Sequence, residues 1–228
     1  MNSKEDPSGC TDRIHYSKRK ITDLNRPVTM QDKRHMTYVA ATLLEVQRIA
    51  PVVTLTLPHA STVDTKLGGY DIPKHTIVLF NIMAAHYDPK YWDKPEEFRP
   101  ERWIGENNEL KKNEAYMPFS LGPRICAGIS LANIETFMAF SNILQRFKLE
   151  SPDKTPMTME GKQSGTIYVP VNDNIRAIPF GAGASTADVG IVGVTVAVVA
   201  GVVVAAGIGV LPAFTDFVVL VVDDAQSH

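Results

Sequence analysis

The sequence is poor in cysteine: its 228 residues hold only Cys10 and Cys126, and no Asn-x-Ser/Thr glycosylation acceptor occurs. Two distant cysteines give no reason to expect a secreted fold held by disulfides, so we expect a reducing, cytosol-facing location. Charge of one sign is also lacking, because 23 Lys and Arg stand against 25 Asp and Glu. Composition therefore gives no reason to expect a nucleic-acid partner.

The start of the chain lacks an apolar run. Residues 1–20 are polar and charged, so we expect neither a signal peptide nor an N-terminal membrane anchor. Residues 1–29 show no hydrophobic periodicity, and we expect them to be irregular or disordered, with Cys10 an exposed bystander.

What the chain does have is a single cysteine between glycines, directly before a helical pattern. A cysteine binds metal as thiolate, which is favoured by the guanidinium of Arg124 and by the N-terminus of the helix that follows. Gly122 and Gly128 would let the backbone approach a flat cofactor, and Phe119 could shield the sulfur from water. We interpret Cys126 as an iron ligand. The alternative is an inert buried cysteine.

A helix is predicted between Met30 and Arg48, where apolar residues recur at helical spacing until Pro51 stops them. Glu45 and Arg48 lie three residues apart and so share one face of it. Taken alone, such a pair is typical of a solvated surface ion pair.

The spacing Phe-x-x-Gly-x-Arg-x-Cys-x-Gly over 119–128 resembles the haem-binding signature of the cytochrome P-450 family, the haem-thiolate monooxygenases. Phe-Arg-Pro-Glu-Arg-Trp over 98–103 resembles the meander segment of that family. The resemblance implies a buried structural triad of Glu45, Arg48 and Arg102 that locks the cysteine loop against the helix. Such a role agrees with the rule that buried charges must be paired.

The same resemblance implies haem as cofactor, with Cys126 as axial iron ligand, Arg124 on a propionate, and Phe119, Gly122 and Gly128 around the ring. His59 resembles a histidine that contacts a propionate in the animal microsomal branch. For His59 a plain surface or packing role stays open, and we assign His86 to packing.

The predicted fold class is α+β, mostly α. Residues 52–57 and 76–80 are expected as strands of a small β-unit around a turn at 68–74. A five-turn amphipathic helix follows Gly128, and short strands are expected at 167–170 and 175–179. The resemblance covers the haem-binding part, residues 30–180, and corresponds to the C-terminal portion of the family's fold.

Residues 189–211 form a long run without charge, which predicts a separate apolar C-terminal helix that spans a membrane, after a linker at 181–188 and before a short tail at 212–228. All Lys and Arg precede the run, so the haem-binding part would face the cytosol, at the endoplasmic reticulum membrane. The alternative is a buried or β-prone tail, because valine and glycine weaken helices.

Three functional hypotheses follow. The resemblance implies a monooxygenase that inserts one oxygen atom from O2 into an apolar organic or steroid-like substrate, with electrons from an NADPH-dependent flavoprotein reductase. We find no counterpart of the family's oxygen-activating helix upstream of residue 30, which favours an inactive truncated relative. The third hypothesis is a membrane-tethered interaction protein without catalysis. No catalytic residue beyond the haem ligand is identified.

Overall fold

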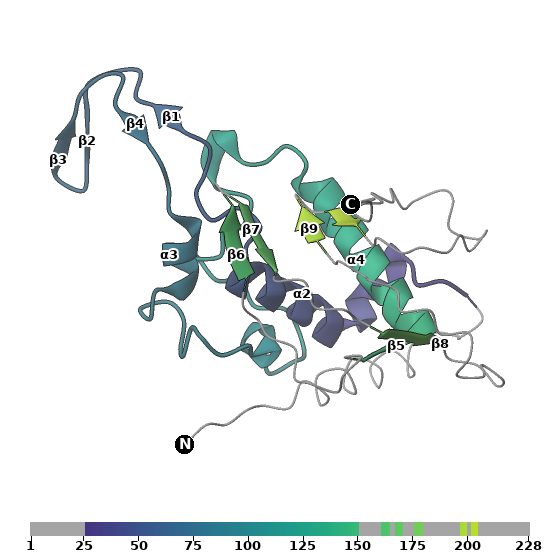
Figure 1. Cartoon of the computed structure of the whole chain (residues 1–228). Coiled ribbons are helices and arrows are strands. Elements are labelled where there is room, and N and C mark those ends of the chain that lie inside the picture. The colour runs from purple at the N-terminus through teal and green to yellow at the C-terminus, as the bar shows by residue number, and fades with distance from the viewer. Residues whose placement is uncertain are drawn as a thin grey trace, which may run out of the picture.

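The computed structural model describes residues 26–150 and five short strand segments after them, at 161–164, 167–170, 176–179, 197–199 and 202–204. The expected N-terminal segment before residue 26, the linker at 181–188 and the tail at 212–228 lie outside these residues. The helices in the described part are η1 (Met30–His35), α2 (Thr37–Ile49), α3 (Ile82–Tyr87), η2 (Pro100–Trp103), η3 (Gly122–Arg124) and α4 (Ile129–Arg146), as Figure 1 shows.

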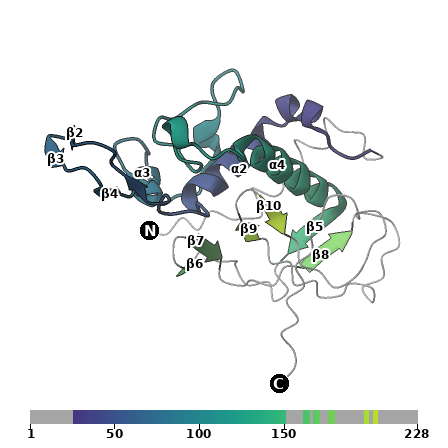
Figure 2. The ribbon, with the colours of Figure 1, turned by 90° about the horizontal axis from the view of Figure 1, so that it is seen from above.

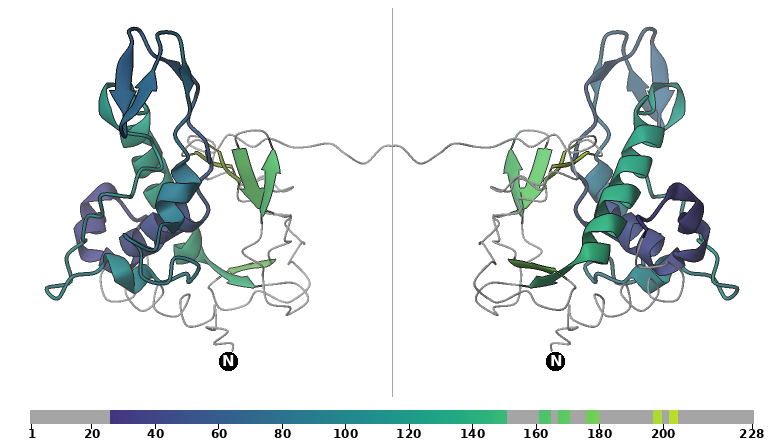
Figure 3. Two further views of the ribbon diagram at one scale, coloured as in Figure 1. Left: turned by 90° about the vertical axis from the view of Figure 1, so that its left-hand side faces the viewer. Right: turned by 90° about the vertical axis from the view of Figure 1, so that its right-hand side faces the viewer.

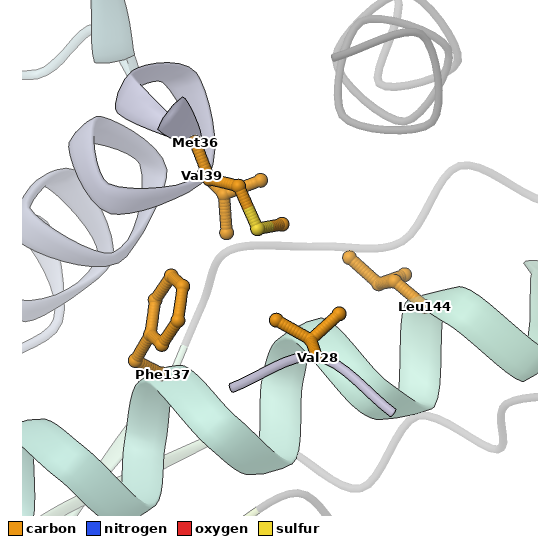
Figure 4. Close-up of a cluster of buried hydrophobic side chains, with 5 residues drawn as sticks. All are labelled: Val28, Met36, Val39, Phe137 and Leu144. Atoms are coloured by element: carbon orange, nitrogen blue, oxygen red, sulfur yellow. The ribbon is translucent and has the colours of Figure 1, made fainter. Parts of the chain in front are cut away.

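Helices α2 and α4 lie side by side and carry the main core (Figure 2). Val39 from α2 and Met36 at its start face Phe137 and Leu144 from α4, and Val28 closes the cluster (Figure 4). Burial of these apolar side chains joins the two helices, since each contributes about 1.5–3 kcal/mol when removed from water. The 18-residue α4 confirms the amphipathic helix predicted after Gly128.

The first predicted helix has an interruption. Residues Met30–His35 form a 3-10 helix, and the α-helix begins only at Thr37, because Met36 adopts φ −113° and ψ 46°. The helix ends at Ile49, directly before Ala50 and Pro51, since proline cannot continue the hydrogen-bond ladder.

Four short strands, labelled in Figure 1, form an arm that projects from the helices and lies at the top of both views of Figure 3. Strand β1 (His59–Ala60) pairs antiparallel with β4 (Ile77–Val78), and β2 (Thr65–Leu67) pairs with β3 (Tyr70–Ile72). Gly68 and Gly69, both at positive φ, make the hairpin turn between β2 and β3. The turn was predicted, whereas β2 and β3 themselves were not.

The strand predicted at 52–57 is wrong in its position. Val53 and Leu55 form isolated bridges to different partners, Ile167 and Asn81, and regular pairing starts only at His59. The segment divides its hydrogen bonds between two neighbours, so no single ladder extends along it.

Four further strands after α4 form two antiparallel pairs. Strand β5 (Phe147–Glu150) pairs with β8 (Arg176–Pro179), and β6 (Gly161–Ser164) pairs with β7 (Ile167–Pro170), all antiparallel. The strands expected at 167–170 and 175–179 are therefore present, the second one residue shorter.

The helix predicted over 189–211 is not what the structure has at the described residues of that range. Strands β9 (Ala197–Val199) and β10 (Val202–Val204) form an antiparallel pair there, and β10 contacts α4. Valine is β-branched and favours strands over helices, which accounts for the difference. Across the described part of the chain, none of the helices combines the length and apolar character that a membrane crossing requires.

Candidate functional site

The carboxylate of Glu45 accepts five hydrogen bonds. Its Oε1 accepts from Nη2 of Arg48 at 2.8 Å, Nε of Arg102 at 3.0 Å and the backbone N–H of Arg99 at 3.0 Å. Its Oε2 accepts from Nε of Arg48 at 2.9 Å and Nε1 of Trp103 at 2.8 Å. The structure thus brings the three residues of the expected triad together and adds a tryptophan.

This cluster is buried and its charges are compensated. Glu45 and Arg48 have no exposed side-chain surface, and the side chain of Arg102 is 7% exposed. Burial raises the pKa of Glu45, but hydrogen bonds from Arg48 and Arg99 outweigh it, so the net pKa is lowered and the carboxylate stays ionised. Arg102 also donates to the carbonyls of Asp93 and Glu97, which ties α2 to the segment before η2.

The cysteine loop turns sharply before α4. Ser120 and Gly122 have φ of 64° and 73°, in the left-handed region, and the backbone N–H of Cys126 donates to the carbonyl of Phe119 at 3.0 Å. These bends bring Cys126 to the start of α4, where the N–H of Ile129 donates to the carbonyl of Cys126 at 3.3 Å. The thiol therefore lies at the N-terminus of α4.

The surroundings of Cys126 are open and partly apolar. The thiol is free and exposed, and the side chains of Leu121 and Ile125 are 55% and 44% exposed beside it. Arg124, in η3, is exposed, and no hydrogen bond or ion pair engages it among the residues the structure describes. Phe119 is half-buried, and the thiol that it was expected to shield from water is exposed.

The two loop glycines differ. A Cβ built on Gly122 would meet no atom within 4 Å, whereas one on Gly128 would lie 3.8 Å from Sγ of Cys126. His59 lies in β1, where its half-buried ring meets Phe80 edge-on at 5.9 Å between centroids.

Sequence reasoning missed two members of the buried network. Trp103 donates to Glu45, a role that its place directly after Arg102 could have suggested. His86 was assigned to packing, but its ring nitrogens approach Arg48 and Met117, and no local pattern signals those partners.

Comparison with known proteins gives the family. The model of the family described as Cytochrome P450 matches residues 11–177, well over half of the chain. The chain belongs to the cytochrome P450 family. It is 36% identical to human cytochrome P450 2U1 over 164 residues, which cover 72% of this chain and 30% of that protein. Mouse cytochrome P450 2J5 is 40% identical over 160 residues, covering 70% of this chain and 32% of the relative.

Solved cytochrome P450 structures agree with this assignment. A zebrafish cytochrome P450 with abiraterone superposes with a TM-score of 0.69 at 36% identity, over 75% of this chain and 40% of that one. A second structure of a zebrafish cytochrome P450, with progesterone, gives a TM-score of 0.68. The cytochrome P450 fold is therefore present in part, and the chain spans about a third of the length of the curated relatives it matches.

Members of the cytochrome P450 family bind haem, and the residues around Cys126 fit that group. Haem needs one protein ligand on its iron, an apolar surface against its ring and a cation near its propionates. The loop presents an exposed thiol, exposed Leu121 and Ile125, the exposed side chain of Arg124 and open space at Gly122. No group of three or more His, Cys, Asp and Glu that could hold a metal ion gathers elsewhere in the described residues.

Proposed function

We propose that this chain supplies the thiolate side of a haem-thiolate monooxygenase, with Cys126 as the axial ligand of the haem iron. The observation that carries the proposal is the exposed thiol at the N-terminus of α4, with apolar side chains beside it. An exposed apolar surface beside an exposed thiol is unfavourable in water, and an apolar planar cofactor would cover both.

Each residue of the loop has a role in this proposal. Arg124 would pair with a haem propionate, and His59 would be a second propionate contact. The open space at Gly122 would admit the ring edge, Gly128 would let the backbone approach the ring beside Cys126, and Phe119 would pack beside the sulfur. Glu45, Arg48 and Arg102 would hold the loop's support rigid. When bound, thiolate-ligated haem supplies the electron density that helps to cleave the O–O bond of O2.

The proposed reaction inserts one oxygen atom into an apolar organic substrate, with electrons from an NADPH-dependent flavoprotein reductase. The family assignment and the animal relatives support it. Zebrafish relatives solved with progesterone and abiraterone favour steroid-like substrates. We place the protein at the endoplasmic reticulum, with its haem-binding part facing the cytosol, by analogy with the microsomal branch.

A second candidate is a chain that keeps the family's core without catalysis. The observation that favours it is that the buried cluster around Glu45 is held by contacts within the protein alone, so the core needs no cofactor for these interactions. The two candidates differ in one measurable property, which is whether this chain forms the thiolate–haem bond.

The test is an absorbance spectrum of the purified chain after addition of haem, dithionite and carbon monoxide, with Cys126→Ser beside it. We expect a strongly red-shifted Soret band that disappears in the variant, because a thiolate ligand on the haem iron would produce that shift and a serine hydroxyl would not. Equal spectra in both proteins, or no red-shifted band, would refute the ligand role and leave the non-catalytic candidate.

A further inference from the structure

His86 is a buried histidine whose two ring nitrogens both have backbone partners. The residue has no exposed surface; Nδ1 lies 3.0 Å from the carbonyl of Arg48, and Nε2 lies 3.0 Å from the backbone N–H of Met117. A carbonyl only accepts and a backbone N–H only donates, so the ring carries its proton on Nδ1 and a lone pair on Nε2. The two partners together define a neutral ring in one tautomer.

The ring is tied into the buried network around Glu45. Nη1 of Arg48 donates to the carbonyl of His86 at 2.9 Å, so the two residues bond each other twice. Tyr116 stacks on His86 at 5.8 Å between centroids and meets Trp103 edge-on at 4.9 Å, and Trp103 donates to Glu45. The contacts link five residues in a ring and so fix the position of His86; the five are Glu45, Arg48, His86, Tyr116 and Trp103.

From His86 a series of backbone contacts leads to Cys126. The N–H of Met117 donates to His86, and the carbonyl of Met117 accepts from the N–H of Ser120 at 3.0 Å. Ser120 directly follows Phe119, whose carbonyl accepts from the N–H of Cys126 at 3.0 Å. The bond to Met117 therefore anchors the beginning of the loop whose end carries the thiol.

We propose that His86 is a positioning residue for Cys126: its neutral Nε2 holds the N–H of Met117 and thereby sets where the cysteine loop begins relative to α2. The proposal rests on the ligand role of Cys126 in the proposed function. Its structural part, that His86 orders the loop, does not depend on haem.

The surroundings of His86 keep its imidazole ring neutral, which is the form that this role requires. Burial and the nearby charge of Arg48 lower the pKa of His86 to about 4, although the hydrogen bond to the carbonyl of Arg48 acts in the opposite direction. Tyr116, the other titratable group against the ring, is neutral, because burial raises the pKa of its hydroxyl. If Nε2 carried a proton, both Nε2 and the backbone N of Met117 would be donors, and the hydrogen bond between them would be lost.

Two variants separate the two bonds of the ring. In His86→Gln the side-chain amide reaches the position of Nε2 and its oxygen can accept from Met117, whereas in His86→Asn the amide reaches only the position of Nδ1 and can donate only to Arg48. We would measure amide hydrogen exchange of the haem-free chain of 228 residues at Met117, Ser120 and Cys126, with amides in the middle of α4 as reference.

We expect exchange at the three loop amides to quicken about tenfold in His86→Asn and to stay within about twofold of the parent in His86→Gln, with the α4 amides unchanged in both. Haem-loaded His86→Asn should also show a smaller fraction of the red-shifted carbon monoxide band than His86→Gln. Equal exchange in the two variants would overturn the proposal, as would faster exchange that is uniform along the chain.

A measurement on the parent chain covers the case in which neither variant folds. Nitrogen-15 NMR of the imidazole at pH 7 should find His86 protonated on Nδ1 alone; protonation on Nε2 or on both nitrogens would contradict the proposed role. Failure of the haem spectrum with normal exchange differences would reject the proposed function and leave the structural part standing.

Discussion

At the scale of single residues, the decisive group is the carboxylate of Glu45. Five donors from four residues converge on it, and the Glu45 side chain has no exposed surface. Removal of one partner leaves a buried charge uncompensated, which is strongly destabilising, so the residues of the cluster depend on one another. Each arginine in it also holds a backbone carbonyl of another segment, and the ionic cluster therefore fixes backbone positions.

We predict that Glu45→Gln lowers the free energy of unfolding by about 3–5 kcal/mol, because two buried guanidinium groups lose their counter-charge and the amide NH2 meets N–H donors. Urea unfolding followed by circular dichroism measures this loss. The matched control is Asp71→Asn, which removes an exposed ion pair with Lys66 and should change stability by less than about 0.5 kcal/mol. Similar small changes in both variants would contradict the assignment of Glu45.

At the scale of elements, the cysteine loop depends on two residues with left-handed backbone. Gly122 adopts its φ of 73° without strain, while Ser120 adopts φ of 64° with a side chain. The loop is held by backbone hydrogen bonds that connect its start to Cys126 and then to α4. Its shape therefore comes from backbone conformation, and α4 is fixed separately by its core contacts with α2.

Gly122→Ala should destabilise the chain by about 1 kcal/mol, since an L-residue is strained at that φ although nothing lies near its Cβ. Ser120→Gly is the matched variant, because it relieves left-handed strain while adding freedom to the unfolded chain, and we expect a change within about 0.5 kcal/mol. Thermal unfolding of both haem-free proteins distinguishes them; equal losses would mean that left-handed strain does not govern this loop.

At the scale of the whole molecule, His86 links three separate parts of the chain, namely α2, α3 and the segment that enters the cysteine loop. The link requires a neutral ring. Stability of the whole protein should therefore depend on pH through this one group, in addition to the acids that the arginines hold ionised.

We predict that the free energy of unfolding is highest above pH 6.5 and falls as the pH drops from 6.5 toward 4, by about 3 kcal/mol from His86. The sign follows because the unfolded histidine takes up a proton in this range whereas the folded one, with its pKa lowered to about 4, does not. Urea titrations at several pH values measure how steeply the free energy of unfolding changes with pH. In His86→Gln this dependence should be smaller by the equivalent of about one proton. Arg48 and Tyr116 face the ring, and burial raises the pKa of the Tyr116 hydroxyl, so Tyr116 stays neutral throughout this range. An unchanged slope in His86→Gln would reject the role of His86 in the acid sensitivity.

Local patterns in the sequence were enough for several elements. The apolar period after Gly128 predicted α4, and the glycine pair predicted the hairpin turn, because both features depend on neighbours a few residues apart. The spacing around Cys126 and the resemblance it carries pointed to the cytochrome P450 family, to which the chain belongs.

Other features depended on partners far along the chain. The segment at 52–57 had strand-like composition, but its backbone bonds are shared between Asn81 and Ile167, so the pairing decided against one continuous strand. The valines within 189–211 gave an apolar run that predicted a helix, while pairing of Ala197–Val199 with Val202–Val204 produced strands. The hydrophobicity of a segment does not determine whether it forms a helix or a strand, because that depends on which other segments can pair with it.

The sequence by itself determined the cysteine loop, the i, i+3 pair of Glu45 and Arg48, and the family, since these rest on residue identities at short spacing. Only the tertiary structure decided that Trp103 joins Glu45 and that His86 takes a hydrogen bond from Met117, 31 residues away. The physical reason is that a buried polar group must find partners wherever the packing brings them, and packing joins residues that no local pattern connects.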